Sequence, residues 1–337
     1  MNTDLNKLLK GTSRSFYLTL RALPGGVRPQ VGLAYLLART SDTIADTELV
    51  SVESRLQALE ALRQRVLGPS RAALQFGSLA QGQALAAEKS LLEKVEDSLA
   101  LLEQLSDADR RLAREVLGTI ISGQELDLKR FAGATPASLA ALETEAELDD
   151  YTYRVAGCVG EFWTRLCRTH LFPQAPLDDA RLLRDGVRFG KGLQLVNILR
   201  DIPADLRKGR CYLPRQALAA AGLAPADLLS PGNHERFRPV YTLFLDAAEG
   251  HLAAGWDYTN ALPPGQIRLR LACAWPVLIG ARTLRRLRQE NVLDSTRRVK
   301  VSRPEIRALI GRSLLLWPWP AAWRGQWARE LNRCNCK

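Results

Sequence analysis

The sequence contains no apolar stretch long enough to cross a membrane as a helix. A spanning helix needs roughly 18 apolar residues in a row, and no run in the chain reaches that length. The nearest candidate, residues 313–323, holds three tryptophans and two prolines and lies between Arg312 and Arg324. We expect this segment to pack against the core. The alternative is that it rests on a bilayer surface, where tryptophan and arginine are both favoured.

Cysteine and histidine are scarce. The six cysteines follow neither a zinc spacing nor the pattern of a secreted disulfide framework, and Cys334 and Cys336 lie in what we expect to be a solvated tail. The three histidines have no partner pattern, and no Ser-His-Asp order, GxGxxG loop or P-loop is present. No signal peptide opens the sequence. We therefore expect a cytoplasmic protein, with peripheral attachment at the inner membrane surface as a further possibility.

Positive charge is in excess. The formal net charge is +11, which favours anionic partners such as a diphosphate, a nucleotide, an anionic membrane or nucleic acid. The basic residues are scattered and do not form an arm with interleaved aromatic residues, so nucleic-acid binding is not expected. Hydrophobic residues make up 46% of the chain, which is enough for a sizeable core.

Strand patterns are almost absent, whereas helical periodicity extends along most of the chain. At 337 residues the chain has room for two average domains or one large helical one. It contains no linker, repeat or low-complexity tract, so we predict a single all-α domain over residues 1–337. The predicted helices include residues 29–45, 48–67, 89–105, 107–131, 144–171, 178–206, 239–260 and 265–290.

The most informative stretch is residues 186–214. Within it Asn197, Asp201 and Asp205 recur every four residues, which places all three on one stripe of a helix. The residues between them are largely apolar, so the helix is expected to be buried, and buried carboxylates must be paired or must bind a cation. Pairing with Arg200 or Arg207 would make this stretch a salt-bridged helix end, and the sequence alone leaves that alternative open.

A second acidic pair strengthens the metal interpretation. Asp42 and Asp46 are also four residues apart in an apolar helical run, and an arginine, Arg39 or Arg200, precedes each pair. Two acidic stripes facing across a cavity would repel each other and need cations. Mg²⁺ suits such a rim, because its sites typically combine one or two carboxylates with waters and substrate phosphates.

Two further stretches carry candidate site residues. Ser13-Arg14-Ser15-Phe16 lies at a helical break followed by a helix, where free amide groups, hydroxyls and a guanidinium can bind phosphate; an N-cap serine beside a surface arginine is the alternative. Tyr151 begins the stretch YTYRVAGCVG, whose Gly157 and Gly160 would be tolerated in a helix where another backbone or a ligand comes close. A buried tyrosine can hold a proton or face a cation, although many are ordinary core residues.

These pieces, in this order, resemble the squalene/phytoene synthase family of head-to-head prenyltransferases. The matching stretches are SRSF, YLLARTSDTIAD, YTYRVAGCVG and QLVNILRDIPADLRKGRCYLP, and the resemblance extends to KVSRPEIRALI near residue 310. It implies an all-α fold of the isoprenoid synthase type, in which two acidic motifs face across a central cavity.

The resemblance also implies roles for individual residues. Asp42, Asp46, Asp201 and Asp205 would hold Mg²⁺ ions that bind the diphosphates. The positions that match diphosphate contacts, polar neighbours of the second motif and cavity tyrosines are Ser13, Arg14, Ser15, Phe16, Tyr35, Arg39, Tyr151, Gln194, Asn197 and Arg200. Tyr151 matches the tyrosine proposed to take part in proton transfer or cation stabilisation.

The later stretch CAWPVLIGARTL resembles squalene synthases more than phytoene synthases. Lys300 and Arg303 match basic positions near the NADPH phosphates, whereas Ser302 replaces a basic residue. Pro203 is a second departure, because a proline inside the second motif predicts a distorted turn at Asp205. The C-terminal anchor of the eukaryotic enzymes is missing from the sequence, so a soluble or peripheral bacterial-type enzyme is expected.

The resemblance favours one function and leaves two alternatives. The first is Mg²⁺-dependent condensation of two farnesyl diphosphates to presqualene diphosphate, followed by NADPH-dependent rearrangement to squalene. The second keeps the fold but makes presqualene diphosphate, dehydrosqualene or phytoene without that reduction. The third is a non-catalytic helical scaffold that binds lipid, which the two intact acidic pairs disfavour.

Overall fold

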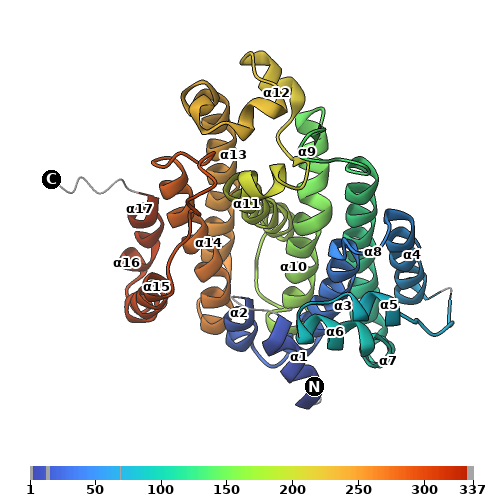
Figure 1. The fold of residues 1–337 in the computed structure, drawn as a ribbon. Coiled ribbons are helices and arrows are strands. Elements are labelled where there is room, and N and C mark those ends of the chain that lie inside the picture. The colour runs from blue at the N-terminus through green and yellow to red at the C-terminus, as the bar shows by residue number, and fades with distance from the viewer. Residues whose placement is uncertain (1–2, 13–15, 69, 332–337) are drawn as a thin grey trace. The chain divides into compact units, whose positions relative to one another are not determined.

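The computed structural model describes residues 3–12, 16–68 and 70–331. Contacts divide the chain into two compact units, residues 1–132 with 161–175 and residues 133–160 with 176–337. Figure 1 follows the chain by colour from the N-terminus to the C-terminus. We call these parts unit 1 and unit 2 and describe each by itself. The prediction of a single domain over residues 1–337 stays a prediction.

Unit 1 is built from helices only, as far as the structure describes it. They are α1 (Thr3–Thr12), α2 (Phe16–Ala22), α3 (Arg28–Asp46), α4 (Val52–Leu67), α5 (Gly77–Gln81), α6 (Ala86–Glu93), α7 (Val95–Glu103), α8 (Asp107–Arg130) and most of α10 (Cys158–Leu171). The predicted helix over residues 29–45 is α3, which packs against α4, α7 and α8. Its apolar side, which includes Leu36, Leu37 and Ile44, is fully buried, and this burial fixes which side of α3 carries its charged residues.

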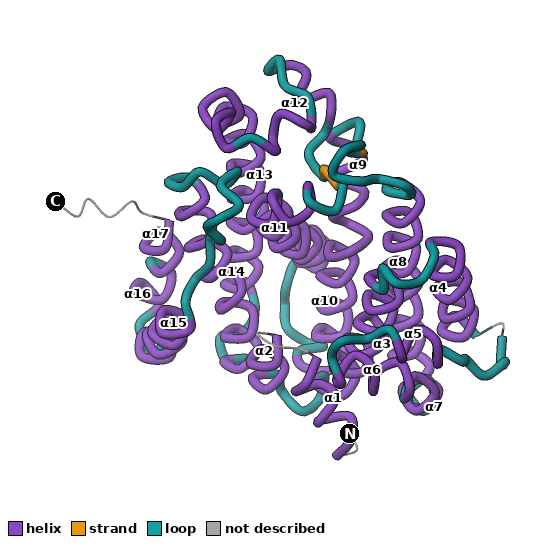
Figure 2. The backbone as a smooth tube through the Cα atoms, viewed as in Figure 1, coloured by secondary structure: helices purple, strands orange, loops and turns teal. Residues whose placement is uncertain are grey.

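Unit 2 contains the longest helices. Its elements are α9 (Glu145–Thr152), the π-helical turn η1 (Tyr153–Gly157), α11 (Asp179–Leu206), α12 (Arg215–Ala220), α13 (His234–Ala261), α14 (Ile267–Leu287), α15 (Arg303–Leu316), α16 (Pro320–Arg324), α17 (Gln326–Leu331), and two short 3₁₀ turns, Pro225–Leu229 and Pro231–Asn233. α11 packs against α13 and α14, and α13 packs against α14. Two strands of two residues each, β1 (Ala140–Ala141) and β2 (Arg210–Cys211), pair in parallel beside α9 (Figure 2). The all-helical prediction is therefore confirmed for the described part of the chain.

Glycines bring two helical segments of unit 2 into backbone contact, as the sequence predicted near Gly160. A Cβ atom added at Gly160 would lie 1.8 Å from the carbonyl oxygen of Gly186, and one added at Gly190 would lie 2.1 Å from that of Ala156. Neither position has room for a side chain. The contact holds the stretch that begins at Tyr151 against the middle of α11, the helix that carries the second acidic pair.

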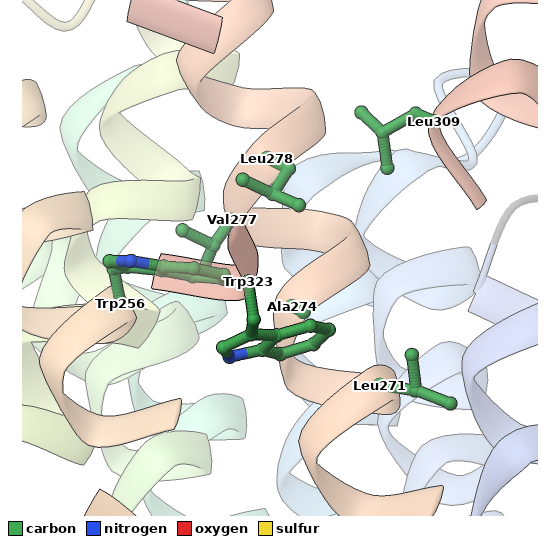
Figure 3. Close-up of a cluster of buried hydrophobic side chains, with 7 residues drawn as sticks. All are labelled: Trp256, Leu271, Ala274, Val277, Leu278, Leu309 and Trp323. Carbon is green, nitrogen blue, oxygen red and sulfur yellow. The ribbon is translucent and has the colours of Figure 1, made fainter. Parts of the chain in front are cut away.

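Tryptophans from distant segments form a buried cluster in unit 2 (Figure 3). The rings of Trp256 and Trp323 stack with centroids 5.5 Å apart, and Trp323 is only 2% exposed. The expectation that residues 313–323 pack against the core is thus confirmed at Trp323. Other side chains of the segment point to water, since Leu315 and Trp319 are 71% and 61% exposed. No helix in the described ranges combines the length and apolar character needed to cross a membrane.

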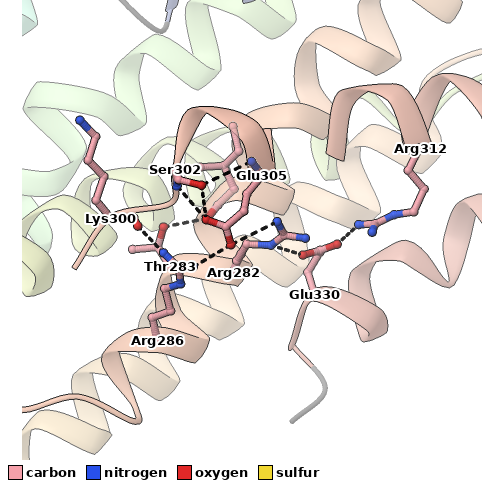
Figure 4. A network of polar contacts seen from close by, with 9 residues as sticks. Arg282, Thr283, Arg286, Lys300, Ser302, Glu305, Arg312 and Glu330 are labelled. Carbon is pink, nitrogen blue, oxygen red and sulfur yellow. Dashed lines mark hydrogen bonds and ion pairs between the residues drawn. The ribbon is translucent and has the colours of Figure 1, made fainter. Parts of the chain in front are cut away.

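A buried glutamate ties the C-terminal helix α17 to α14 and α15. Glu330 is 1% exposed, accepts a hydrogen bond of 2.7 Å from Nε of Arg282 and pairs with Arg312 (Figure 4). The start of α15 is fixed beside it by a capping box, in which Ser302 and Glu305 satisfy each other's amide groups. Arg286 donates to Glu305 at 2.7 Å. These contacts hold the loop that precedes α15 against α14.

Candidate active site

The first acidic pair lies at the C-terminal end of α3 in unit 1. Spacings of four, three and four residues place Tyr35, Arg39, Asp42 and Asp46 along one side of the helix. Arg39 forms an ion pair with Asp42 and donates to Oε1 of Glu88, on α6, at 2.6 Å. Its Nε is buried and has no hydrogen-bond acceptor among the described residues. Arg39 therefore joins two carboxylates and keeps one N–H group unused.

The charge of this pair is not fully compensated. Although 44% of the Asp42 side chain is exposed, desolvation by the surrounding protein and repulsion from Asp46 raise the pKa of Asp42 to about 6, against the opposing effect of Arg39. Asp46 is itself exposed. An additional cation would therefore lower the repulsion between these carboxylates.

The second acidic pair lies at the C-terminal end of α11 in unit 2. Nε of Arg200 donates to Asp201 at 3.0 Å, and Nη2 of Arg298 donates to the same carboxylate at 3.2 Å. Burial would raise the pKa of Asp201, but the hydrogen bonds and charges of the two arginines outweigh it and hold this pKa below its ordinary value. The salt-bridged alternative is thus partly correct, with Arg200 as the partner. Asp201, unlike Asp42, has its charge compensated by the protein.

The helix continues past the proline in this motif. α11 runs through Pro203 to Leu206, so Asp205 follows Asp201 by one turn of the same helix. Pro203 therefore does not end the helix, and the distorted turn expected at Asp205 stays a prediction. Of the other predicted residues on α11, Asn197 is exposed and Gln194 is half-buried, in the two turns that precede Asp201.

Tyr151 packs against a second tyrosine. It lies in the last turn of α9, just before the π-helical turn, and its ring stacks on that of Tyr212 with centroids 4.8 Å apart. Tyr212 directly follows β2, which pairs with β1. The chain that leaves the second motif is thereby held against the helix that carries Tyr151. Helical π-turns of this kind often occur at functional sites.

Several predicted residues cannot be placed in detail. Ser13, Arg14 and Ser15 lie outside the described residues, and Phe16 is placed only as the first residue of α2. Tyr35 donates from its hydroxyl to the carbonyl oxygen of Thr12 at 3.3 Å. α3 therefore contacts the end of α1 directly before the predicted phosphate corner.

The two predicted cofactor contacts lie in unit 2, around the start of α15. Lys300 is exposed, and its carbonyl oxygen accepts a hydrogen bond from Arg286 while its side chain extends away from the polar network (Figure 4). Arg303 is exposed and is the first residue of α15. Arg298, in the same loop as Lys300, contacts Asp201. This basic loop thus adjoins the second acidic pair.

Sequence reasoning missed three residues that complete these sites. Glu88 holds Arg39, Arg298 holds Asp201, and Tyr212 stacks on Tyr151. Glu88 and Arg298 are far in sequence from their partners, so no spacing rule could find them. Tyr212 belongs to the motif stretch CYLP, but nothing in the local pattern indicates its contact with Tyr151.

The described residues contain no group of three or more histidine, cysteine, aspartate or glutamate side chains placed to hold a metal ion. The acids form pairs instead, with oxygen ligands only. This donor set fits Mg²⁺, which commonly completes its octahedral shell with waters and substrate phosphates and does not require an all-protein cage.

Comparison with known proteins gives one family. Residues 9–305 match the family described as squalene/phytoene synthase. The chain is 32% identical over 255 residues to the presqualene diphosphate synthase of Zymomonas mobilis, an alignment that covers 76% of this chain and 74% of the relative. It is 30% identical to the bifunctional lycopene cyclase/phytoene synthase of Colletotrichum graminicola, covering 74% of this chain but only 41% of that longer protein.

Solved structures give the same fold. The structure of TcSQS with the ligand E5700 matches with a TM-score of 0.78 at 20% identity, covering 98% of this chain and 92% of the other. The prediction of an all-α fold of the isoprenoid synthase type is confirmed. The central cavity and the roles of the individual site residues stay predictions.

Proposed function

Because the chain belongs to the squalene/phytoene synthase family, whose members are prenyltransferases of isoprenoid biosynthesis, we propose that it condenses two farnesyl diphosphates head to head and, with NADPH, forms squalene. The observation that carries this proposal is the matched pair of acidic clusters. Each unit contributes two aspartates one helical turn apart, and each pair has an arginine in contact with one carboxylate. A non-catalytic scaffold would have no use for two such arrangements.

We assign the aspartates to Mg²⁺ and the arginines to diphosphate. Asp42, Asp46, Asp201 and Asp205 would hold the ions, and the raised pKa of Asp42 supports this role because the carboxylate lacks sufficient compensation. Bound Mg²⁺ would supply charge neutralisation for the departing diphosphate. Arg39 has an unused N–H group with which to contact a phosphate oxygen, and we assign Arg200 the same role at the second pair. Ser13, Arg14, Ser15, Phe16, Gln194 and Asn197 are proposed to complete the substrate contacts.

The first reaction makes a cyclopropane. Loss of diphosphate from one farnesyl chain leaves an allylic cation, and the double bond of the second chain attacks it. Loss of one proton then closes the ring and gives presqualene diphosphate, so one diphosphate and one proton are released. We assign cation stabilisation and proton transfer to Tyr151, whose stacking on Tyr212 fixes the orientation of its ring. Tyr35, on the same side of α3 as Arg39, is assigned to the substrate chains.

The second reaction requires a hydride. Ionisation of presqualene diphosphate and rearrangement would give a cation that the hydride of NADPH converts to squalene. We propose that Lys300 and Arg303 bind the NADPH phosphates, because both are exposed cations and Arg298 of the same loop contacts Asp201. The Zymomonas relative, named as a presqualene diphosphate synthase, favours the alternative in which the reaction stops before this step.

Product identification distinguishes these possibilities. With farnesyl diphosphate, Mg²⁺ and NADPH we expect squalene, and without NADPH we expect presqualene diphosphate or products diverted from it, measured by mass spectrometry. A Lys300→Ala, Arg303→Ala variant is expected to give the NADPH-free pattern even when NADPH is present. Presqualene diphosphate under both conditions would remove the reductive step, and phytoene from the twenty-carbon diphosphate would make the enzyme a phytoene synthase. The absence of any head-to-head product would refute the proposal.

We also propose that the protein works in the cytoplasm and contacts the inner membrane peripherally. The product is a hydrocarbon that water does not dissolve, so release into a bilayer would be favourable. Leu314, Leu315 and Trp319 are more than half exposed, and tryptophan is favoured at a membrane surface. These three side chains are the proposed contact.

A further inference from the structure

Pro203 interrupts the hydrogen bonding of α11 between the two aspartates of the second motif. Proline has no amide hydrogen, so it cannot donate to the carbonyl oxygen of Leu199, four residues earlier, and its ring crowds that oxygen. Leu199 is fully buried, at 0% exposure, so water cannot replace the missing donor. A buried carbonyl without a partner is costly and rare in folded proteins.

A side chain from another helix supplies the missing hydrogen bond. The hydroxyl of Tyr241, on α13, donates to the carbonyl oxygen of Leu199 at 3.1 Å. Tyr241 is 2% exposed, and its ring is fixed against the buried ring of Phe237, with centroids 5.1 Å apart. Burial also raises the pKa of Tyr241 far above its ordinary value, so the hydroxyl keeps its proton and remains a donor.

We propose that Tyr241 is a positioning residue for the second acidic motif, because its hydroxyl replaces the helical hydrogen bond that Pro203 removes and so keeps Asp205 in line with Asp201. Asp205 lies beyond the interruption, in the last turn of a helix that ends at Leu206. The bond from α13 therefore acts at Leu199, before Asp205 in α11, at the point where the helical hydrogen bonding is interrupted. Its role in metal and diphosphate binding rests on the proposed function, whereas the bond itself does not.

A double-mutant cycle tests the bond without any substrate. Tyr241→Phe removes only the hydroxyl, and Pro203→Ala restores an amide that can donate to Leu199. In the background that keeps Pro203, we expect Tyr241→Phe to lower the folding equilibrium constant by about fivefold, which corresponds to the net stabilisation by a typical hydrogen bond. In the Pro203→Ala protein we expect a loss of less than about twofold. Equal losses in the two backgrounds, measured by urea unfolding, would overturn the proposal.

A binding measurement tests the positioning role. The quantity measured is the Mg²⁺ concentration that gives half of the stabilisation of the full-length protein by inorganic pyrophosphate. We expect Tyr241→Phe to raise this Mg²⁺ concentration about fivefold. In the double variant, Pro203→Ala should restore the original Mg²⁺ requirement. Tyr258→Phe is the matched control, since Tyr258 is also buried on α13, and should leave the requirement unchanged.

The outcomes separate this proposal from the proposed function. A loss of stability with an unchanged Mg²⁺ requirement would show that Tyr241 is only structural and would overturn the positioning role. If the wild-type protein shows no Mg²⁺-dependent stabilisation by pyrophosphate, the proposed function and the positioning role both fail, and the unfolding cycle still decides whether Tyr241 replaces the bond lost at Pro203.

Discussion

Replacing Asp42 by asparagine is expected to lower the rate of product formation by at least about tenfold, equivalent to 1.4 kcal/mol, and to make the metal-free protein more stable at pH 7. The first effect follows from the loss of a proposed Mg²⁺ ligand. The second follows from the raised pKa of Asp42, because a carboxylate whose ionised form is disfavoured in the folded state destabilises that state whenever it is charged.

The sign of the pH dependence follows from the same shift. Asp42 has a pKa of about 6 in the folded protein against an ordinary value of 3.8. The stability that it contributes is therefore fully present below pH 4, falls as the pH rises, and is lost above about pH 6. In a metal chelator, Asp42→Asn should remove this part of the decline, and unfolding curves recorded from pH 4 to pH 8 measure it.

Glu93→Gln provides the control for this prediction. Glu93 is an exposed carboxylate of unit 1 outside the acidic pair, so its replacement should leave turnover, stability and Mg²⁺ dependence unchanged. The account would be wrong if Asp42→Asn retained full turnover, the result expected of a non-catalytic scaffold. A decrease in the stability of the metal-free variant would contradict the inference that the ionised form of Asp42 destabilises the folded protein.

Replacing Glu330 by alanine is expected to destabilise unit 2 by about 3–5 kcal/mol, the usual cost of removing one partner from a buried ion pair. Glu330 is almost completely buried between Arg282 and Arg312, and Arg282 is itself only 11% exposed. The variant would remove the carboxylate between the two arginines and leave Arg282 only its 3.8 Å ion pair with Glu305 among the described residues. Chemical denaturation, followed by tryptophan fluorescence because the Trp256–Trp323 cluster lies in the same unit, measures the loss.

Glu305→Ala is the comparison for Glu330. Glu305 also pairs with arginine, but 31% of its side chain is exposed, so its loss should cost less than that of Glu330. A cost below about 1 kcal/mol for Glu330→Ala would show that water compensates the arginines as it does at a surface.

The helices could be predicted because the residues that become buried are apolar and recur in the sequence at helical spacing. Apolar residues at helical spacing predicted residues 29–45 and 178–206, which the structure gives as α3 (Arg28–Asp46) and α11 (Asp179–Leu206). The start of α13 was predicted at Pro239, but the helix begins at His234. A proline near a helix start is tolerated when the carbonyl group that loses its hydrogen-bond donor lies at the exposed end. For Pro239 that carbonyl group belongs to Glu235, four residues earlier, which is exposed. The π-helical turn at residues 153–157 could not be predicted, because it does not change the spacing of the apolar residues.

The site could be predicted only as far as local spacing reaches. Both aspartate pairs and the arginines Arg39 and Arg200 are visible in sequence, because their geometry is that of a single helix. Glu88, Arg298 and Tyr241 contact these motifs from 42 to 97 residues away, and such contacts depend on tertiary packing. Tyr241 supplies one of these contacts beside Pro203, through which α11 continues. The sequence alone predicted this helix over residues 178–206, with a distorted or new turn at Asp205, but not the contact from α13.

Our central proposal is that each of the two aspartate pairs binds diphosphate through Mg²⁺. Calorimetric binding of farnesyl thiodiphosphate, a substrate analogue that ionises poorly, tests it in the wild-type protein, Asp42→Asn and Asp201→Asn. The account predicts that each replacement weakens Mg²⁺-dependent binding by at least about tenfold. Wild-type affinity in either variant would contradict it.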